Sequence, residues 1–153
     1  LPTIATLKVC VLASTQSAAS LAQAKELSTA FAGMGVGITV IGETLTSGVN
    51  QTYSAADATS FDGIIIASGA ESLFDPASTS TFFPAGRPGQ ILVDGYRWGK
   101  PVGALGSASG VLSTAGIKTT AGVYVANQTA SFVSSFAEGL KTFKFIDRFA
   151  VDS

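Results

Sequence analysis

The segment KPVGALGSASGVLSTAGI, from Lys100 to Ile117, contains a complete strand–turn–helix unit. Its first part, PVGALG, is an apolar run that predicts a buried strand, and Gly116 ends the helix that follows. The turn between them, GSAS at 106–109, contains only small residues. In α/β proteins this kind of turn often presents a nucleophile, so the segment raises the question of whether it is an active site.

Four further apolar runs have the composition of buried strands. They are continuous rather than alternating, which is typical of parallel strands that are covered on both faces. Helical stretches separate them, as the crossovers between parallel strands require. The sequence therefore predicts a flavodoxin-like three-layer α/β/α sandwich with a parallel, doubly wound sheet. The five predicted strands are Leu7–Ala13, Gly37–Gly42, Gly63–Ser68, Pro101–Gly106 and Gly122–Ala126.

Apolar residues at helical spacing predict four helices between and after these strands. Ligands of doubly wound sheets bind beyond the carboxyl ends of the strands, so the loops 14–20, 68–72 and 106–110 are the candidate binding loops. The segment 74–88 is the one long loop. The predicted helices run from about Ala18 to Met34, from about Gly89 to Gly99, from the central turn to Gly116, and from Ala130 to about Phe145.

Length and composition indicate one globular domain with little surface charge. The chain has 153 residues, enough for a sizeable core, and we expect the domain over residues 7–153 after a linker at 1–6. Hydrophobic residues make up 46% of the chain and charged residues 12%, so part of the surface is expected to be covered. The net charge of -1 does not favour nucleic acid, and no apolar run is long enough to cross a membrane.

The reactive residue types are few. The chain lacks histidine, which removes the usual general base and the usual metal ligand. Its one cysteine, Cys10, cannot form an internal disulfide and lies in an apolar run, so we expect inert packing. Acidic residues are scattered along the sequence, and no metal site is predicted.

The three candidate loops carry hydroxyl groups and one acid. The first leads into a helix N-terminus, where N–H groups either hold an anion or are capped by Ser and Thr. Glu71 is either a polar anchor or a solvated carboxylate. No Walker lysine or dinucleotide glycine pattern is present, so a flavin or another anion is only the alternative function. The candidate ligand residues are Ser14, Thr15, Ser17, Ser68, Gly69, Glu71 and Ser109.

Two further features bear on function. Neither Ser107 nor Ser109 stands in G-x-S-x-G spacing, and without histidine neither hydroxyl has a general base to activate it. Small residues at this turn also let a helix approach a strand closely. Phe82 and Phe83 lie in the long loop, where they are either core residues or an exposed apolar contact surface.

The segment 100–117 resembles the elbow of the PfpI-type branch of the class I glutamine amidotransferase-like superfamily, which typically reads KPVAAICHGPxLLAxAGL. The segment 61–73, FDGIIIASGAESL, is similar to the family's YDALVLPGG strand and turn. In this register the family's cysteine nucleophile falls on Gly106 and its histidine on Ser107. The family's acidic partner has no counterpart at 17–20. The resemblance implies an elbow without its reagents and a domain that is not itself an enzyme.

One group resembles the whole pattern: the C-terminal domain of large-subunit haem catalases of fungal type, which lacks the cysteine. The resemblance implies a homotetrameric parent that disproportionates hydrogen peroxide to water and oxygen with haem. The haem would be bound outside this segment, so no cofactor is expected here. It implies two kinds of partner, the parent's catalase core and tetramer mates, and unfolding proteins held through apolar surface. Phe82 and Phe83 are the candidate contacts for such clients.

Two NQT sequons, beginning at Asn50 and Asn127, permit glycosylation if the parent is secreted. Such tripeptides also occur by chance. The sequence therefore leaves the compartment open between cytoplasmic and secreted.

Overall fold

The computed structural model describes residues 6–75, 82–118 and 120–142. In this part of the chain six parallel strands form one sheet, in the order β3-β2-β1-β4-β5-β6. The strands are β1 (Lys8–Leu12), β2 (Gly37–Gly42), β3 (Gln51–Thr52), β4 (Gly63–Ile66), β5 (Val102–Leu105) and β6 (Val123–Ala126).

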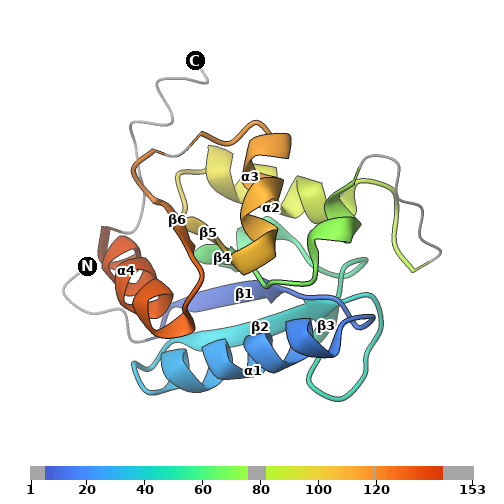
Figure 1. The fold of residues 1–153 in the computed structure, drawn as a ribbon, viewed down its shortest axis with the longest axis horizontal. Coiled ribbons are helices and arrows are strands. Elements are labelled where there is room, and N and C mark those ends of the chain that lie inside the picture. The colour runs from blue at the N-terminus through green and yellow to red at the C-terminus, as the bar shows by residue number, and fades with distance from the viewer. Residues whose placement is uncertain (1–5, 76–81, 119, 143–153) are drawn as a thin grey trace.

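Helices cover both faces of the sheet, as Figure 1 shows. Three short 3-10 turns, at 58–60, 71–74 and 106–108, follow strands or precede helices. The architecture is the flavodoxin-like three-layer sandwich predicted from the sequence. The α-helices are α1 (Ala18–Ala32), α2 (Arg87–Arg97), α3 (Ser109–Thr114) and α4 (Thr129–Thr142).

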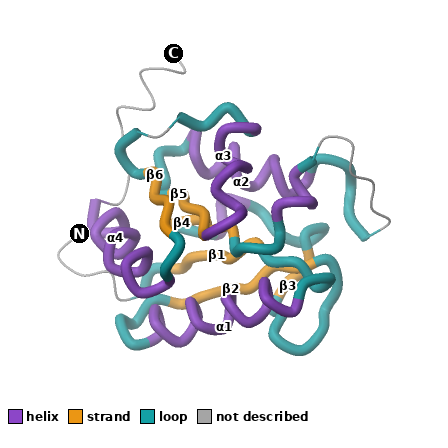
Figure 2. The backbone as a smooth tube through the Cα atoms, in the orientation of Figure 1, coloured by secondary structure: helices purple, strands orange, loops and turns teal. Residues whose placement is uncertain are grey.

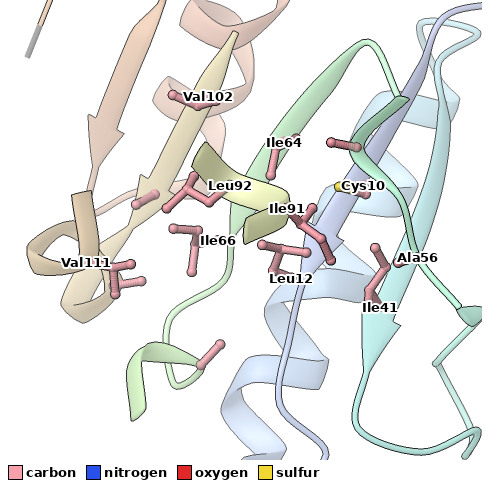
Figure 3. Close-up of a cluster of buried hydrophobic side chains, with 14 of the residues drawn as sticks. Cys10, Leu12, Ile41, Ala56, Ile64, Ile66, Ile91, Leu92, Val102 and Val111 are labelled. Carbon is pink, nitrogen blue, oxygen red and sulfur yellow. The ribbon is translucent and has the colours of Figure 1, made fainter. Parts of the chain in front are cut away.

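The core consists of two apolar layers, one on each face of the sheet. Side chains of β1 alternate between them, with Val9 and Val11 facing α1 and α4, and Cys10 and Leu12 facing α2 and α3. Figure 3 shows the second layer, in which Ile91 and Leu92 of α2 lie over the strand residues. This double coverage explains why the five predicted strands contain continuous apolar runs.

All five predicted strands are present, and a sixth, β3, was missed. The five predicted strands have the order 2-1-3-4-5 of flavodoxin-like sheets, and β3 adds an edge beside β2. β3 has only two residues and no apolar run. The Asn50 side chain holds the entry to this strand, because its Oδ1 accepts a hydrogen bond of 2.8 Å from the Val40 N–H.

Several predicted helix boundaries differ from the observed ones by one or two residues. The second helix begins at Arg87 rather than Gly89, because Pro88 fits the first turn of a helix, where no N–H partner is needed. The first helix ends at Ala32, and Met34 is 38% exposed instead of continuing the buried stripe. The predicted linker at 1–6 lies outside the described residues except for its last residue. The predicted end of the last helix, at Phe145, lies wholly outside them. Figure 2 shows the loops that join these elements.

Candidate functional site

The turn after β5 has the backbone geometry of a nucleophile elbow. Leu105 ends the strand in an extended conformation, and Gly106 follows in the left-handed region at φ +56°. A side chain is strained in that region, which is where an elbow holds its nucleophile. A Cβ atom at Gly106 would lie 3.2 Å from the Ser68 Oγ. The position therefore points toward the loop after β4, but it presents no reactive group.

Three polar side chains surround this turn. The Oγ atoms of Ser68 and Ser107 are 2.8 Å apart, and the Glu71 carboxylate accepts a hydrogen bond from Ser107. The Gly69 N–H also donates to Glu71 Oε1 at 2.8 Å. Because an ionised carboxylate only accepts, Ser107 donates to Glu71 and Ser68 donates to Ser107. The predicted loops after β4 and β5 thus meet in one hydroxyl–hydroxyl–carboxylate chain.

The acid at the end of this chain is a weak base. Partial burial raises the pKa of Glu71, but hydrogen bonds from Ser107 and from the backbone N–H groups of Glu71 and Gly69 outweigh it. The net pKa lies below the ordinary value of a glutamate. General bases work best with a pKa near the working pH, and a carboxylate with a lowered pKa does not take a proton from a serine hydroxyl. The arrangement positions hydroxyl groups without activating them.

A cavity of about 320 Å³ opens beside the elbow, between the 3-10 turn at 71–74 and α3. Its wall is mixed in character, with two carboxyl groups, two hydroxyl groups and two apolar side chains. Ser109 is half-buried at the start of α3 and does not line the cavity. The lining residues are Glu71, Phe74, Asp75, Ser107, Gly110, Val111 and Thr114.

The loop after β1 is held by a buried acid. Glu43, which follows β2 and is 4% exposed, accepts hydrogen bonds from the Ser14 Oγ at 2.8 Å and the Thr15 N–H at 2.7 Å. Glu43 is not among the residues predicted from the sequence. The available signal was its position directly after the predicted strand 37–42, at the edge where the carboxyl ends of the parallel strands meet.

The remaining polar groups of this loop also bond within the protein. The Ser14 N–H donates to the Ser20 Oγ, and the Ser17 Oγ caps α1 by accepting from the Ser20 N–H at 3.1 Å. The Gln16 N–H donates to the Ser14 Oγ. With these donors occupied and the Glu43 carboxylate beside them, the loop is not arranged to attract an anion. Capping is the role that the geometry favours for Ser17, whereas Ser14 fastens the loop to Glu43.

The loop after β4 packs directly on α1. Gly69 has φ +92°, and the Ser17 Oγ occupies the place where a side chain at Gly69 would begin. The Ser68 N–H donates to Gln23 Oε1 of α1 at 2.6 Å. These contacts lie at the switch in strand order, where doubly wound sheets bind their ligands.

The other sequence candidates separate into buried and exposed residues. Cys10 is fully buried, and this burial raises the pKa of its thiol well above the ordinary value, so it is not a nucleophile. Phe83 is 9% exposed and packs on Tyr53 with the ring centroids 5.2 Å apart. Phe82 is 50% exposed. Of this pair, only Phe82 offers apolar surface.

Two further observations concern the same described residues. No group of three or more His, Cys, Asp or Glu side chains is placed to hold a metal ion there. None of the helices in these segments has the length and apolar character needed to cross a bilayer.

A second, shallow cavity of about 690 Å³ lies between α1 and α4, lined by Ala22, Lys25, Glu26, Thr29, Ala30, Thr129, Ala130 and Val133.

Known proteins match the chain along nearly its whole length. A family model described as the C-terminal domain found in long catalases matches residues 5–150. Catalase-3 of Neurospora crassa is 54% identical over 154 residues, which cover 99% of this chain and 21% of that protein. A catalase of Blumeria hordei and catalase B of Aspergillus oryzae are each 50% identical, over 100% and 95% of this chain and 22% of those proteins. The chain spans about a fifth of the length of these relatives.

Proposed function

Because this chain belongs to the family of C-terminal domains found in long catalases, we propose that it is a non-catalytic accessory domain. Its role is to stabilise a parent catalase and to hold unfolding proteins through apolar surface. The parent would disproportionate hydrogen peroxide to water and oxygen with haem, as the resemblance implies. The partners of the domain are then the catalase core, the other subunits of the parent tetramer and unfolding clients.

The observation that carries the non-catalytic part of this proposal is the empty nucleophile position. Gly106 keeps the left-handed elbow conformation, while the nearest hydroxyl groups end on a carboxylate with a lowered pKa. Attack on a substrate needs a nucleophile with a base adjusted to accept its proton, and neither is present at this turn.

The residues of this domain do not fit a haem site. Haem iron is held by His, Cys, Met or Tyr, and the chain has no histidine. Cys10 is fully enclosed, and the Tyr53 hydroxyl is buried and donates to the Ala13 carbonyl. Neither of the two cavities described above is lined by Cys, Met or Tyr. This chemistry supports the proposal that the parent binds its haem in the catalase core, outside this domain.

Exposed apolar side chains support the holding part of the proposal. They come from different elements, which suits many weak contacts with an irregular client better than one shaped site. The chain as a whole carries little charge, since only 12% of its residues are charged. Among the described residues the large exposed ones are Met34, Leu45, Phe82, Trp98 and Val125.

An aggregation assay tests this function. The purified chain, mixed in molar excess with citrate synthase, is expected to suppress the light scattering that develops when citrate synthase is heated. Phe82→Ser should weaken the suppression because it removes an exposed ring, whereas Phe82→Tyr should retain it. A wild-type chain that leaves scattering unchanged would rule out the holding role.

Stabilisation of the parent needs a separate test. In a long catalase that carries this domain, deletion of the domain is expected to lower the thermal midpoint of the remaining core. An unchanged midpoint would exclude a stabilising role, whatever the outcome of the aggregation assay.

A further inference from the structure

The two edges of the sheet differ in how they are protected. β3, at one edge, has only two residues, both polar, and the Asn50 side chain holds its entry. β6, at the other edge, has the uncharged sequence VYVA, with no lysine, proline or glycine. Charged side chains, proline and very short strands are the usual means by which proteins prevent an edge from pairing with another chain. β6 contains neither a charged residue nor a proline, so it lacks both of these protections.

The backbone direction of β6 follows from its pairing with β5. The Val102 N–H donates to the Gly122 carbonyl at 3.0 Å, so Gly122 and, two residues later, Tyr124 face β5. Val123 and Val125 therefore direct their backbone groups to the outer side. The Val123 N–H turns back to the Thr120 carbonyl at 3.1 Å. Within the described residues no strand pairs with this outer side.

The side chain of Val125 lies on the poorly covered face of this edge. Val125 points to the same side of the sheet as Val123, the face of α2 and α3, and α3 has only six residues. Val123 is 9% exposed, whereas Val125 is 49% exposed. The edge thus combines the outward N–H of Val125 and the outward carbonyl groups of Val123 and Val125 with an apolar side chain.

We propose that the outer edge of β6 at Val125 binds an extended, apolar segment of an unfolding protein as an added strand. Backbone N–H and C=O groups at two-residue spacing are matched by another extended backbone, and not by a helix, whose own backbone groups are already bonded. The neighbouring Val125 side chain favours an apolar segment. This inference rests on the proposed holding function and assigns it a site.

Hydrogen exchange tests the site directly. The probe is reduced, carboxymethylated α-lactalbumin, a permanently unfolded protein, added to the ¹⁵N-labelled 153-residue chain. Exchange at the Val125 N–H is expected to slow by about fivefold or more, the effect of one new hydrogen bond. The Val123 N–H, already bonded to Thr120, is the internal control and should not change.

A pair of variants separates the backbone from the side chain. Val125→Pro removes the outward N–H but no bond to β5, so the sheet is expected to stay intact. It should raise the chain concentration needed to suppress citrate synthase aggregation by about fivefold. Val125→Thr keeps the N–H and the branched shape, and should behave like the wild type.

The outcomes distinguish the site from the function. If the wild type suppresses aggregation but α-lactalbumin leaves the Val125 exchange unchanged, the edge proposal is wrong and the holding function stands. If Val125 is protected but aggregation continues, the edge binds peptides and the holding function fails. If Val125 is protected without any probe, and sedimentation shows a dimer, a second copy of the chain occupies the edge and the proposal is overturned.

Discussion

At the scale of single residues, Glu43 is the side chain on which the loop after β1 depends. Its two carboxylate oxygens accept from Ser14 and Thr15 in a nearly enclosed position. Glu43→Gln places an amide N–H₂ against one of these donors, so we expect a loss of about 1–3 kcal/mol in the free energy of unfolding.

Urea denaturation measures this loss, with Glu138→Gln as the control. Glu138 forms only an exposed pair with Lys141, and its replacement should change the free energy of unfolding by less than about 0.5 kcal/mol. Equal stability of the two variants would mean that Glu43 does not hold the loop.

The Ser107 hydroxyl lowers the pKa of Glu71, so its removal has a predictable sign. In Ser107→Ala one hydrogen bond to the carboxylate is lost, and the pKa of Glu71 should rise toward the ordinary value of a glutamate. Because the folded-state pKa is depressed, Glu71 stabilises the fold above the ordinary pKa, and this contribution is lost as the pH falls through the folded pKa. The acid sensitivity that Glu71 contributes should therefore be smaller in Ser107→Ala.

An NMR titration of the Glu71 side chain in both proteins gives the two pKa values. Thr114→Ala is the control. It removes a hydroxyl group that lines the same cavity but donates to the Gly110 carbonyl and not to Glu71. Identical titration of Glu71 in the wild type and in Ser107→Ala would contradict the hydrogen-bonded chain.

At the scale of elements, close packing between β5 and α4 depends on Gly103. A Cβ atom there would meet the buried Phe132 ring at 2.5 Å and the Tyr124 carbonyl at 3.0 Å, and neither neighbour has room to move. Gly103→Ala is expected to destabilise the fold by about 1–3 kcal/mol through overpacking.

Gly110 provides the matched comparison, because it lies in α3 with no atom within 4 Å of an added Cβ. Gly110→Ala should leave the free energy of unfolding unchanged or raise it by up to about 1 kcal/mol, since alanine favours the helix. Its thermal midpoint should therefore stay the same or rise. The packing account fails if both variants melt at the same temperature.

The sequence predicts the elements that are buried on both faces and misses those that are not. Continuous apolar runs identified five strands: β1, β2, β4 and β5 lie between two helical layers, and β6 keeps an apolar sequence although its Val125 is half exposed. β3 was not predicted, because two polar residues at a sheet edge show no hydrophobic periodicity. The start of α2 was misplaced because a proline was taken as part of the loop, although Pro88 lies in the first turn.

The site was predicted in part for the same physical reason. Parallel strands bring their carboxyl ends to one edge, so the meeting of Ser68 with Ser107 follows from the fold class. The bonds of Glu71 and the role of Glu43 depend on loop conformations, which local sequence does not determine. Whether Phe82 or Phe83 is exposed depends on the contact with Tyr53, which lies about thirty residues earlier in the chain.

At the scale of the whole molecule, the domain combines a preserved fold with a surface of low charge. The chain spans about a fifth of the length of its catalase relatives. We propose that the domain acts through contacts: with the parent enzyme, with clients, and at the outer edge of β6. None of these roles requires a reaction at the elbow.

The measurement that tests this account most directly is hydrolysis of an activated ester, p-nitrophenyl acetate, by the wild type and by Ser107→Ala. The account predicts equal rates without saturation, because no group at the elbow attacks a carbonyl. Saturable turnover by the wild type that Ser107→Ala abolishes would show an active nucleophile at the turn after β5 and contradict the account.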